Sequence, residues 1–367
     1  MKTIKNSLKN SISEENITNR GERFLVTGTY VLVILFITGF SFIMFQDRFT
    51  NTGKNETALY HKITASYELK EYQKALDECS DFNAQYPDST NKVTVMVIEA
   101  EIFFTINDID KTRDIIQKIF SENRIENSDY VRASVLLGKI TKNDGIYDPV
   151  VMNYLENAYL KAEGLQKMEI AGFLGYQALF NRDYKTAIKY FNISTGEEGI
   201  IGRARVYIDQ GNYQAAIQEY MNFFIDYPDG ARYGRVRNAF IKQSLYFAGN
   251  LKKSGDFKRS IQYYLNIADM FPDDPSAYEA LIKIADIYSI NKNYQNAADF
   301  LDKACSIGCT NGIEEALYNK AVVYYQWGKK NESIKLFKEL QQKYPSGSFS
   351  RKSGDWIELI KKDIENN

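Results

Sequence analysis

The stretch NYQAAIQEYMNFFIDYPDG (residues 212–230) decides the fold of this chain. Apolar or small residues recur in it at three- and four-residue intervals, which is the spacing of one face of an α-helix. They are Tyr213, Ala216, Tyr220 and Phe223. Pro228 follows them, and a proline disfavours the helical conformation in the residue before it. We therefore predict an amphipathic helix that ends just before Pro228.

The same pattern recurs along the chain. Four of the six prolines follow an aromatic residue, at positions 87, 228, 272 and 345. Extending the template gives eight residues that open a helix: Tyr72, Ile109, Tyr147, Tyr184, Tyr213, Phe257, Tyr294 and Lys330. The residue three positions after each opening is small in most repeats. These residues are Ala75, Thr112, Val150, Ala187, Ala216, Ser260, Ala297 and Ser333. Another such residue lies nine positions before each opening: Ile63, Ala100, Gly138, Gly175, Ala204, Ala248, Ala285 and Ala321. The openings are about 37 residues apart on average, a period that is typical of helical repeat proteins.

Each repeat predicts two antiparallel helices of about 12–15 residues, which bury little surface alone and therefore stack into a continuous core. Small residues allow the paired helices to approach to the usual axial distance of about 8–10 Å. Short polar turns such as DQGN (209–212) and KSGD (253–256) lie between the helices. Gly or Asn in these turns tolerates the left-handed conformation of a helix end.

These segments resemble the tetratricopeptide repeat. The resemblance is carried by LGYQALFNRDYKTAIKYFNIS (174–194), ARVYIDQGNYQAAIQEYMNFFIDYP (204–228) and AVVYYQWGKKNESIKLFKELQQKYP (321–345). It covers residues 56–346 and is weakest in the second and third repeats. It implies an all-α fold, an α-solenoid of about eight helix pairs with a groove lined by the first helix of each pair. Residues 347–367 are expected to form a C-terminal capping helix and tail that pack through Trp356 and Leu359.

An uncharged apolar segment, FLVTGTYVLVILFITGFSFIMF, runs from residue 24 to residue 45. It is long enough to cross the roughly 30 Å hydrocarbon core of a bilayer, so we predict an N-terminal transmembrane helix. A cleaved signal peptide is the alternative, but its apolar region would be only about 7–15 residues long. Lys and Arg are more frequent in residues 1–23 than after the helix. This bias predicts a cytoplasmic N-terminal tail, a linker at 46–55 and a solenoid outside the cytoplasm.

The sequence offers no constellation typical of catalysis. The net charge is −1, from 46 basic and 47 acidic residues, so we expect no nucleic-acid partner. No phosphate-binding loop or nucleophile motif occurs in the sequence. His61 is the only histidine, and Cys79, Cys305 and Cys309 do not have the spacing of a metal site. We expect no enzyme activity, no cofactor and no metal, and either a disulfide or two buried apolar side chains at Cys305 and Cys309.

The resemblance implies that partner contacts come from first-helix residues that face the groove. Mapping the groove positions of the family onto this chain gives twelve candidates: Tyr60, Tyr67, Glu101, Phe104, Lys139, Tyr176, Arg205, Lys242, Lys252, Asp286, Tyr318 and Tyr325. The central repeats contribute basic residues and the ends contribute aromatic ones. A partner segment with an acidic centre is therefore expected, although the same residues could simply solvate a curved surface.

Two further stretches are assigned from the repeat. ARYGRVR (231–237) is expected in a long loop, where its arginines either bind acidic groups or cap a neighbouring helix. The stretch 212–230 is expected to contribute mainly to packing between helices. The surface for partners is then expected one helix earlier, around Arg205.

The layout predicts a membrane-anchored protein–protein interaction scaffold in a cell-envelope complex. The junctions of an aromatic residue, proline and Asp or Ser resemble those of the periplasmic repeat proteins of outer-membrane assembly and the Tol–Pal system, which commonly enter by a lipoprotein or cleavable signal. The single anchor fits the layout of single-anchor co-chaperones and flagellar-collar subunits better. Two alternatives stay open: an envelope co-chaperone or assembly factor, and a structural subunit of a membrane motor such as a flagellar collar. The expected location is the inner (cytoplasmic) membrane, single-pass, with the C-terminal domain in the periplasm. The reverse orientation, and homo- or hetero-oligomers, stay open as well.

Overall fold

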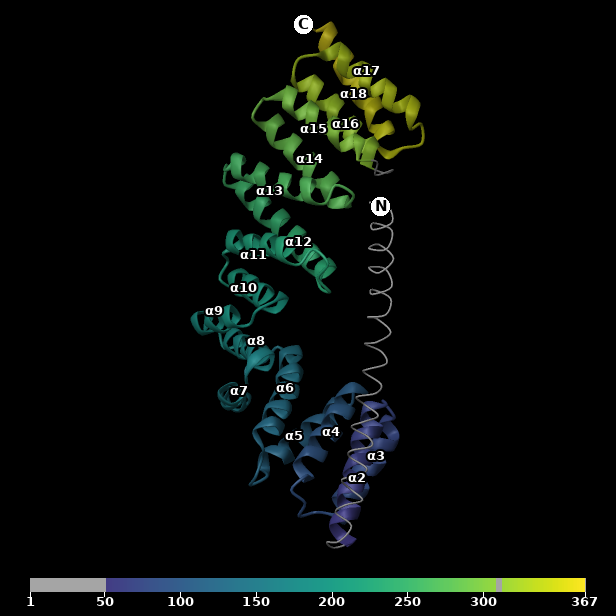
Figure 1. Ribbon diagram of the computed structural model, residues 1–367. Coiled ribbons are helices and arrows are strands. Elements are labelled where there is room, and N and C mark those ends of the chain that lie inside the picture. The colour runs from purple at the N-terminus through teal and green to yellow at the C-terminus, as the bar shows by residue number, and fades with distance from the viewer. Residues whose placement is uncertain (1–50, 308–311, 367) are drawn as a thin grey trace, which may run out of the picture. The chain divides into compact units, whose positions relative to one another are not determined.

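The computed structural model describes residues 51–307 and 312–366, and every regular element in these residues is an α-helix (Figure 1). The helices are α2 (Asn51–Glu68), α3 (Tyr72–Gln85), α4 (Lys92–Thr105), α5 (Ile109–Ser121), α6 (Asn127–Asp144), α7 (Pro149–Lys161), α8 (Gly164–Phe180), α9 (Tyr184–Ile193), α10 (Glu197–Asp209), α11 (Tyr213–Asp226), α12 (Tyr233–Lys253), α13 (Phe257–Met270), α14 (Pro275–Ile290), α15 (Tyr294–Ser306), α16 (Gly312–Gln326), α17 (Lys330–Lys343) and α18 (Ser348–Glu365).

The helices form the eight predicted pairs, α2/α3 through α16/α17, followed by α18. In seven of these pairs, all except α6/α7, the two helices pack against each other. The packing of α13 on α14 and of α15 on α16 shows that successive pairs also stack. Seven of the eight second helices begin at the predicted opening residue: Tyr72, Ile109, Tyr184, Tyr213, Phe257, Tyr294 and Lys330. The prediction of an all-α solenoid of helix pairs is confirmed for the described residues.

The turn inside each of these seven pairs has one construction. A residue with positive φ lies two positions before the second helix: Lys70, Asn107, Arg182, Gly211, Gly255, Lys292 and Gly328. In five of them the next side chain accepts a hydrogen bond from the third backbone N–H of the following helix: Asp108, Asp183, Asn212, Asp256 and Asn293. The left-handed residue ends one helix and the cap begins the next, so a three-residue turn suffices.

The predicted small residues lie where the two helices of a pair meet. Ser260 and Ser333 are fully buried, and each hydroxyl donates a 2.7 Å hydrogen bond to a backbone carbonyl oxygen of the first helix. Those carbonyls belong to Ala248 and Ala321, the small residues predicted on the first helices. The two small positions of these repeats therefore face each other across the pair, as close approach of the axes requires.

The third helix pair departs from the predicted register. Its second helix begins at Pro149 rather than Tyr147, and Val150 is 56% exposed rather than buried. Gly145 has the expected positive φ, but the chain stays non-helical over residues 146–148. Pro149 explains the delay, because the residue before a proline avoids the helical conformation while the proline itself fits the first turn. The buried side chains of α7 are Val151, Leu155 and Ala158.

The long interval between the openings at Tyr213 and Phe257 is occupied by helix, so the prediction of a long loop was wrong. α12 has 21 residues and begins at Tyr233, which places most of ARYGRVR in its first turns. The spacing of 44 residues exceeds the usual 37 by seven, or about two helical turns. An insertion of two turns keeps the apolar face of the helix in register.

The C-terminal helix packs against α16 and α17, as predicted for a cap. The Trp356 ring lies parallel to the ring of Phe337, with centroids 6.0 Å apart. Ile357 and Ile360 are the buried apolar residues of this helix, whereas Leu359 is 51% exposed. The prediction that Leu359 anchors the cap was therefore wrong, because the buried face of α18 lies to either side of it.

The N-terminal predictions fall mostly outside the described residues. The apolar segment 24–45 and the tail 1–23 belong to the part that the structure does not describe. Among residues 51–307 and 312–366, no helix has the length and hydropathy to span a bilayer. Residues 51–55 were expected in a linker, but they are part of α2.

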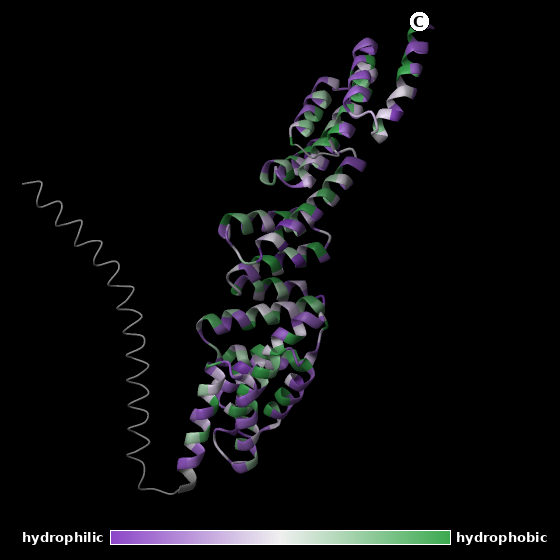
Figure 2. Ribbon diagram, turned by 90° about the vertical axis from the view of Figure 1, so that its right-hand side faces the viewer, coloured by the Kyte–Doolittle hydropathy of each residue, from purple (hydrophilic) through white to green (hydrophobic). Residues whose placement is uncertain are grey.

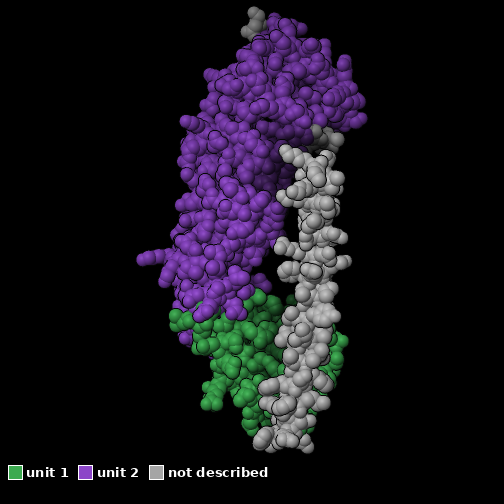
Figure 3. Space-filling view, in the orientation of Figure 1, with its two compact units in different colours: residues 1–140, 160–162 green, residues 141–159, 163–367 purple. Residues whose placement is uncertain are grey.

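The described chain divides into two compact units (Figure 3). The first comprises the described residues up to Ile140 and Leu160–Ala162, and the second comprises Thr141–Tyr159 and the residues from Glu163 onward. Within the second unit, one hydrophobic cluster runs from Ile200 to Val323. Figure 2 shows hydrophobic and hydrophilic residues alternating along the helices, as amphipathic helices of a repeat protein require.

Candidate partner-binding surface

The first helices of successive pairs are neighbours within each unit. α8 contacts α10, α12 contacts α14 and α14 contacts α16 in the second unit, while α2 contacts α4 in the first. Within each unit, we call the surface formed by the first helices the first-helix face of that unit. Ala204 of α10 is fully buried in the pair, whereas Arg205, one residue later, is exposed. The predicted candidates occupy such positions beside the buried small residues.

In the first unit, two candidates belong to a polar network. Arg132 donates two hydrogen bonds to the Glu101 carboxylate, Nε to Oε1 at 3.0 Å and Nη2 to Oε2 at 2.6 Å. Its Nη1 also lies 3.5 Å from Asp129, which is almost fully buried. Burial and the neighbouring Glu101 charge raise the pKa of Tyr67 to about 12, and the Tyr67 hydroxyl donates to that carboxylate. Tyr67 and Glu101 therefore bind each other and Arg132 along the stacked first helices.

In the second unit, Glu198 at the start of α10 is the centre of a similar network. Its carboxylate lies 2.5 Å from Lys142 Nζ and 2.5 Å from Arg232 Nη1. Burial by itself would raise the pKa of Glu198, but hydrogen bonds from Lys142 and Tyr176 and the nearby positive charges hold it below its usual value. Burial and the Glu198 charge also raise the pKa of Tyr176. The carboxylate is thus ionised and shared by three neighbours.

Tyr176 offers almost no surface to a partner. It is 4% exposed, and its ring packs edge-on against Phe191 with centroids 5.0 Å apart. Lys142 lies over the same ring, 4.7 Å from its centroid. The groove position of the family is therefore occupied here by a side chain that packs between the helices of its own pair.

Four more candidates near the C-terminus have partners one repeat away. The Lys252 ammonium pairs with Asp286, 34 residues later. The Tyr325 hydroxyl lies 3.3 Å from Asp363, and Tyr318 accepts a 2.8 Å hydrogen bond from the indole of Trp356, each 38 residues apart. The first of these contacts joins α12 to α14, which are the first helices of neighbouring repeats. The other two join α16, the first helix of the eighth pair, to α18. Most polar candidates are therefore satisfied within the protein.

Of the five remaining candidates, Tyr60, Phe104 and Lys139 are half-buried. Tyr60 packs against the hydrophobic cluster of α2, α3 and α4, and its ring lies 5.8 Å from that of His61. Phe104 lies at the end of α4, and Lys139 lies near the end of α6. The structure does not bring these side chains together into one cluster.

Three basic side chains of the second unit differ from the candidates that have a polar partner within the protein. Arg205, Arg235 and Lys242 are exposed, and none has a carboxylate partner among the residues that the structure describes. Arg235 and Lys242 are seven residues apart on α12, hence on one helix face. Burial raises the pKa of Tyr220 to about 12, while the charges of Arg205 and Arg235 both act to lower it. The two guanidinium groups therefore share the neighbourhood of one tyrosine.

A small cavity opens on the same face between α14 and α16. It has a volume of about 220 Å³ and is lined by Ile282, Lys283, Asp286, Val322 and Gln326, among others. Apolar side chains form part of the wall, and Lys283 adds another cation. The lining also contains the Asp286 carboxylate, so the cavity carries both signs of charge, and the exposed cations without a carboxylate partner lie on α10 and α12.

Sequence analysis did not predict Arg132 and Glu198 as internal partners, nor that Trp356 would hydrogen-bond Tyr318 and Arg232 would pair with Glu198. A signal for some of them exists, because Arg132 and Glu101 are 31 residues apart and Trp356 and Tyr318 are 38 apart. Complementary side chains separated by about one repeat are candidates for contact between stacked helices.

The described residues show no sign of a metal or thiol site. No group of three His, Cys, Asp or Glu side chains suited to a metal ion occurs in 51–307 and 312–366. Burial, then the charges of Glu99 and Glu78, raise the pKa of Cys79 to about 12. Cys305 is half-buried and not in a disulfide, and Cys309 lies outside the described residues.

Comparison with known proteins supports the repeat assignment. Family models described as tetratricopeptide repeat match residues 248–311 and residues 315–347. The resemblance predicted for these last repeats is confirmed, so this part of the chain consists of tetratricopeptide repeats. The repeats also indicate a protein–protein interaction scaffold. No curated protein matches the chain.

Several solved structures are similar to this chain at low sequence identity. A tetratricopeptide repeat protein from Parabacteroides merdae is 12% identical, covering 74% of this chain and 97% of its own, with a TM-score of 0.43. The C-terminal part of a repeat protein from Cytophaga hutchinsonii is 14% identical, covering 68% and 96%, with a TM-score of 0.46. The tetratricopeptide repeat domain of P58(IPK) is 11% identical, covering 85% and 100%, with a TM-score of 0.29.

Proposed function

We propose that this chain is a non-catalytic scaffold whose second unit binds an acidic segment of a partner protein on its first-helix face. One observation carries the proposal. Arg205, Arg235 and Lys242 are exposed without a carboxylate partner in the described residues, while Lys252, Lys142 and Arg232 are all paired. Exposed cations without an internal partner favour carboxylates of a partner and steer its approach.

A photo-crosslinking amino acid at position 205 tests this proposal in the full chain. We expect it to capture partner segments that contain several Asp or Glu residues, identified by mass spectrometry. The same amino acid at Lys335, an exposed position of the second helix α17, is the matched control. Equal capture of the same segments from both positions would contradict the proposal.

Charge reversal provides an independent check on the captured partner. The double variant Arg205→Glu, Lys242→Glu should weaken its binding, and salt should weaken binding to the original chain, because exposed charges are screened beyond about 8–10 Å. The reversal Lys335→Glu should leave binding unchanged. Binding that is insensitive to both the reversal and salt would mean that the contact is not electrostatic.

We further propose that residues 24–45 anchor the protein in the inner membrane and that the solenoid lies in the periplasm. The support is the uncharged length of the segment and the excess of Lys and Arg before it. Reporter fusions at the C-terminus test this topology, since a reporter active only in the cytoplasm should stay silent. A cytoplasmic signal would overturn the orientation.

The identity of the captured proteins decides between the remaining roles. One stoichiometric envelope protein supports a scaffold, and many unfolded secreted or membrane proteins support a co-chaperone. Components of a membrane motor would support a structural role such as a flagellar collar.

A further inference from the structure

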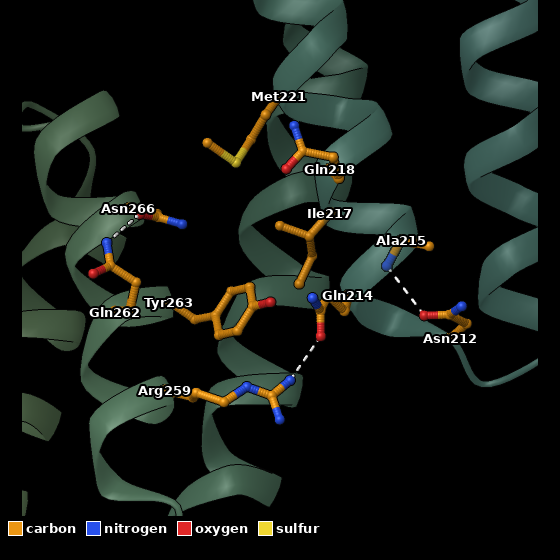
Figure 4. A pocket seen from close by; sticks show the side chains of 10 residues that line it. All are labelled: Asn212, Gln214, Ala215, Ile217, Gln218, Met221, Arg259, Gln262, Tyr263 and Asn266. Carbon is orange, nitrogen blue, oxygen red and sulfur yellow. Dashed lines mark hydrogen bonds between the residues drawn. The ribbon is translucent and has the colours of Figure 1, made fainter.

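A second groove lies between the second helices α11 and α13 (Figure 4). Its volume is about 740 Å³, within the roughly 300–1,000 Å³ that is typical of ligand pockets. Ile217, Met221 and Tyr263 supply its apolar part, and Figure 4 shows Met221 and Tyr263 pointing into the space between the helices. The Tyr263 ring is held in place by Phe247, with centroids 5.0 Å apart. The groove is separate from the first-helix face and lies outside the proposed function.

Apart from Arg259, the polar part of this groove consists of carboxamide side chains, those of Asn212, Gln214, Gln218, Gln262 and Asn266. Gln218 donates from Nε2 to Asn222 Oδ1 at 3.1 Å on α11, and Gln262 donates to Asn266 Oδ1 at 3.0 Å on α13. The two pairs occupy the same positions, five and nine residues after the openings Tyr213 and Phe257. Each carboxamide keeps further donors and acceptors beyond this one bond, because its amino group has two protons and its oxygen two lone pairs.

The carboxamide pair is specific to the two helices that border the groove. At the same two positions the other regularly opened second helices carry mostly charged side chains: Asp77 and Asp81, Asp114 and Lys118, Lys189 and Ile193, Asp299 and Lys303, Lys335 and Glu339. A pair that served only to solvate an exposed helix would be expected in any repeat. Its restriction to α11 and α13 indicates that these side chains serve the groove itself.

The lining carries one ionic group, and that group is already engaged. Arg259 donates from Nη2 to Gln214 Oε1 at 2.7 Å, and its Nη1 lies 3.4 Å from Asp256. A charged ligand would therefore enter without a counter-ion in the lining, which disfavours it. An uncharged ligand with alternating donors and acceptors matches two equivalent carboxamide pairs, and an extended peptide backbone has such groups along its length.

We propose that the groove between α11 and α13 binds an extended, uncharged peptide segment of a partner protein through its backbone. Gln218 and Gln262 hydrogen-bond backbone N–H and C=O groups of the segment. One aromatic or aliphatic side chain of the segment packs against Tyr263 and Met221. The protein thereby has two partner surfaces, an electrostatic one on the first helices and a neutral one on the second helices.

A random peptide library displayed on phage and selected on the full chain tests this proposal. We expect a class of selected peptides without net charge and with a large apolar residue. The double variant Gln218→Ala, Gln262→Ala should weaken their binding about tenfold, as the loss of two hydrogen bonds implies. The variant Asp299→Ala, Lys335→Ala, at the equivalent position of α15 and α17, is the matched control and should leave binding unchanged. Circular dichroism of both variants checks that the fold is retained.

Two further measurements separate this proposal from others. N-methylation of the central peptide amides should abolish binding, because the backbone is the group that is recognised. The reversal Arg205→Glu, Lys242→Glu should not change the binding of these peptides, because it alters the first-helix face and not the groove. A failure of the proposed function can therefore be told apart from a failure of this proposal. Absence of any peptide that depends on the glutamine pair would overturn the proposal. Binding of an oligosaccharide on a glycan array, dependent on the pair and without any such peptide, would also overturn it.

Discussion

Replacement of Gly202 by alanine should destabilise the second unit, although alanine favours a helix more than glycine does. An added Cβ would lie 2.3 Å from two ring carbons of Phe191 and 2.6 Å from a third. Carbon atoms in contact are separated by about 3.5–4.0 Å, so the ring would have to move by more than about 1 Å. Phe191 is fully buried, Tyr176 packs on it, and a Cβ at Gly175 would lie 2.7 Å from the same ring. The ring therefore has no direction in which to move freely.

The magnitude follows from two opposing contributions. Overpacking of a buried site costs about 1–3 kcal/mol, and this overlap lies toward the upper end. Alanine in place of glycine inside a helix contributes about 1 kcal/mol in the opposite direction. We expect a net decrease of about 1–2 kcal/mol in the free energy of unfolding, measured by urea denaturation with far-ultraviolet circular dichroism.

Gly249 is the matched control for this substitution. It also lies inside a helix, but the nearest atom to an added Cβ is the Tyr264 hydroxyl at 3.8 Å. Gly249→Ala should therefore stabilise the protein by up to about 1 kcal/mol. Phe191→Leu combined with Gly202→Ala should cost less than the sum of the two single changes. A stabilising Gly202→Ala, or simple additivity with Phe191→Leu, would refute this account of the packing.

Three further outcomes are expected in the same denaturation assay. Burial raises the pKa of Glu99, so its contribution to stability is largest at low pH and falls as pH rises through the folded-state pKa. Glu99→Gln should therefore increase the free energy of unfolding at neutral pH. No gain at neutral pH would contradict the burial argument. The pKa of Glu198 is lowered, so its contribution to stability is present above the unfolded-state pKa and is lost as pH falls through the folded-state pKa. Glu198→Gln should therefore cost about 1–3 kcal/mol of unfolding free energy at neutral pH and little in acid. Ser260→Ala removes a buried hydrogen bond to the Ala248 carbonyl and should cost about 0.5–1.5 kcal/mol, whereas an unchanged midpoint would mean that the bond is dispensable.

The fold was largely predictable because its determinants are local and repeated. Tyr213 opens a helix and Pro228 ends one in the same way wherever such residues occur, since capping and proline sterics act over a few residues. The third pair shows the limit of this reasoning. Gly145 signals the usual turn, but Pro149 two residues after the expected opening postpones the helix.

The candidate surface was predictable only in outline. Position beside a small first-helix residue correctly placed Arg205 at an exposed site, but the same rule placed Tyr176 there, and that ring is buried against Phe191. Whether a polar side chain faces solvent or a neighbour depends on the residue one repeat away. Glu101 is held by Arg132, whereas Lys242 has no such partner in the described residues.

The sequence by itself determined the helix pairs, the start of seven of the eight second helices and the small residues at most crossings, because periodic burial and helix ends depend on neighbours within a few residues. Only the tertiary structure decided which charged side chains have no partner of opposite charge in the described residues, and where a groove lies between second helices. Both depend on distances between residues about 30–45 positions apart: the Arg259 guanidinium meets Gln214, 45 residues earlier, and two carboxamide pairs border one space. Stacking of the repeats brings such residues together, and a pattern of residues that are close in the sequence does not predict these contacts.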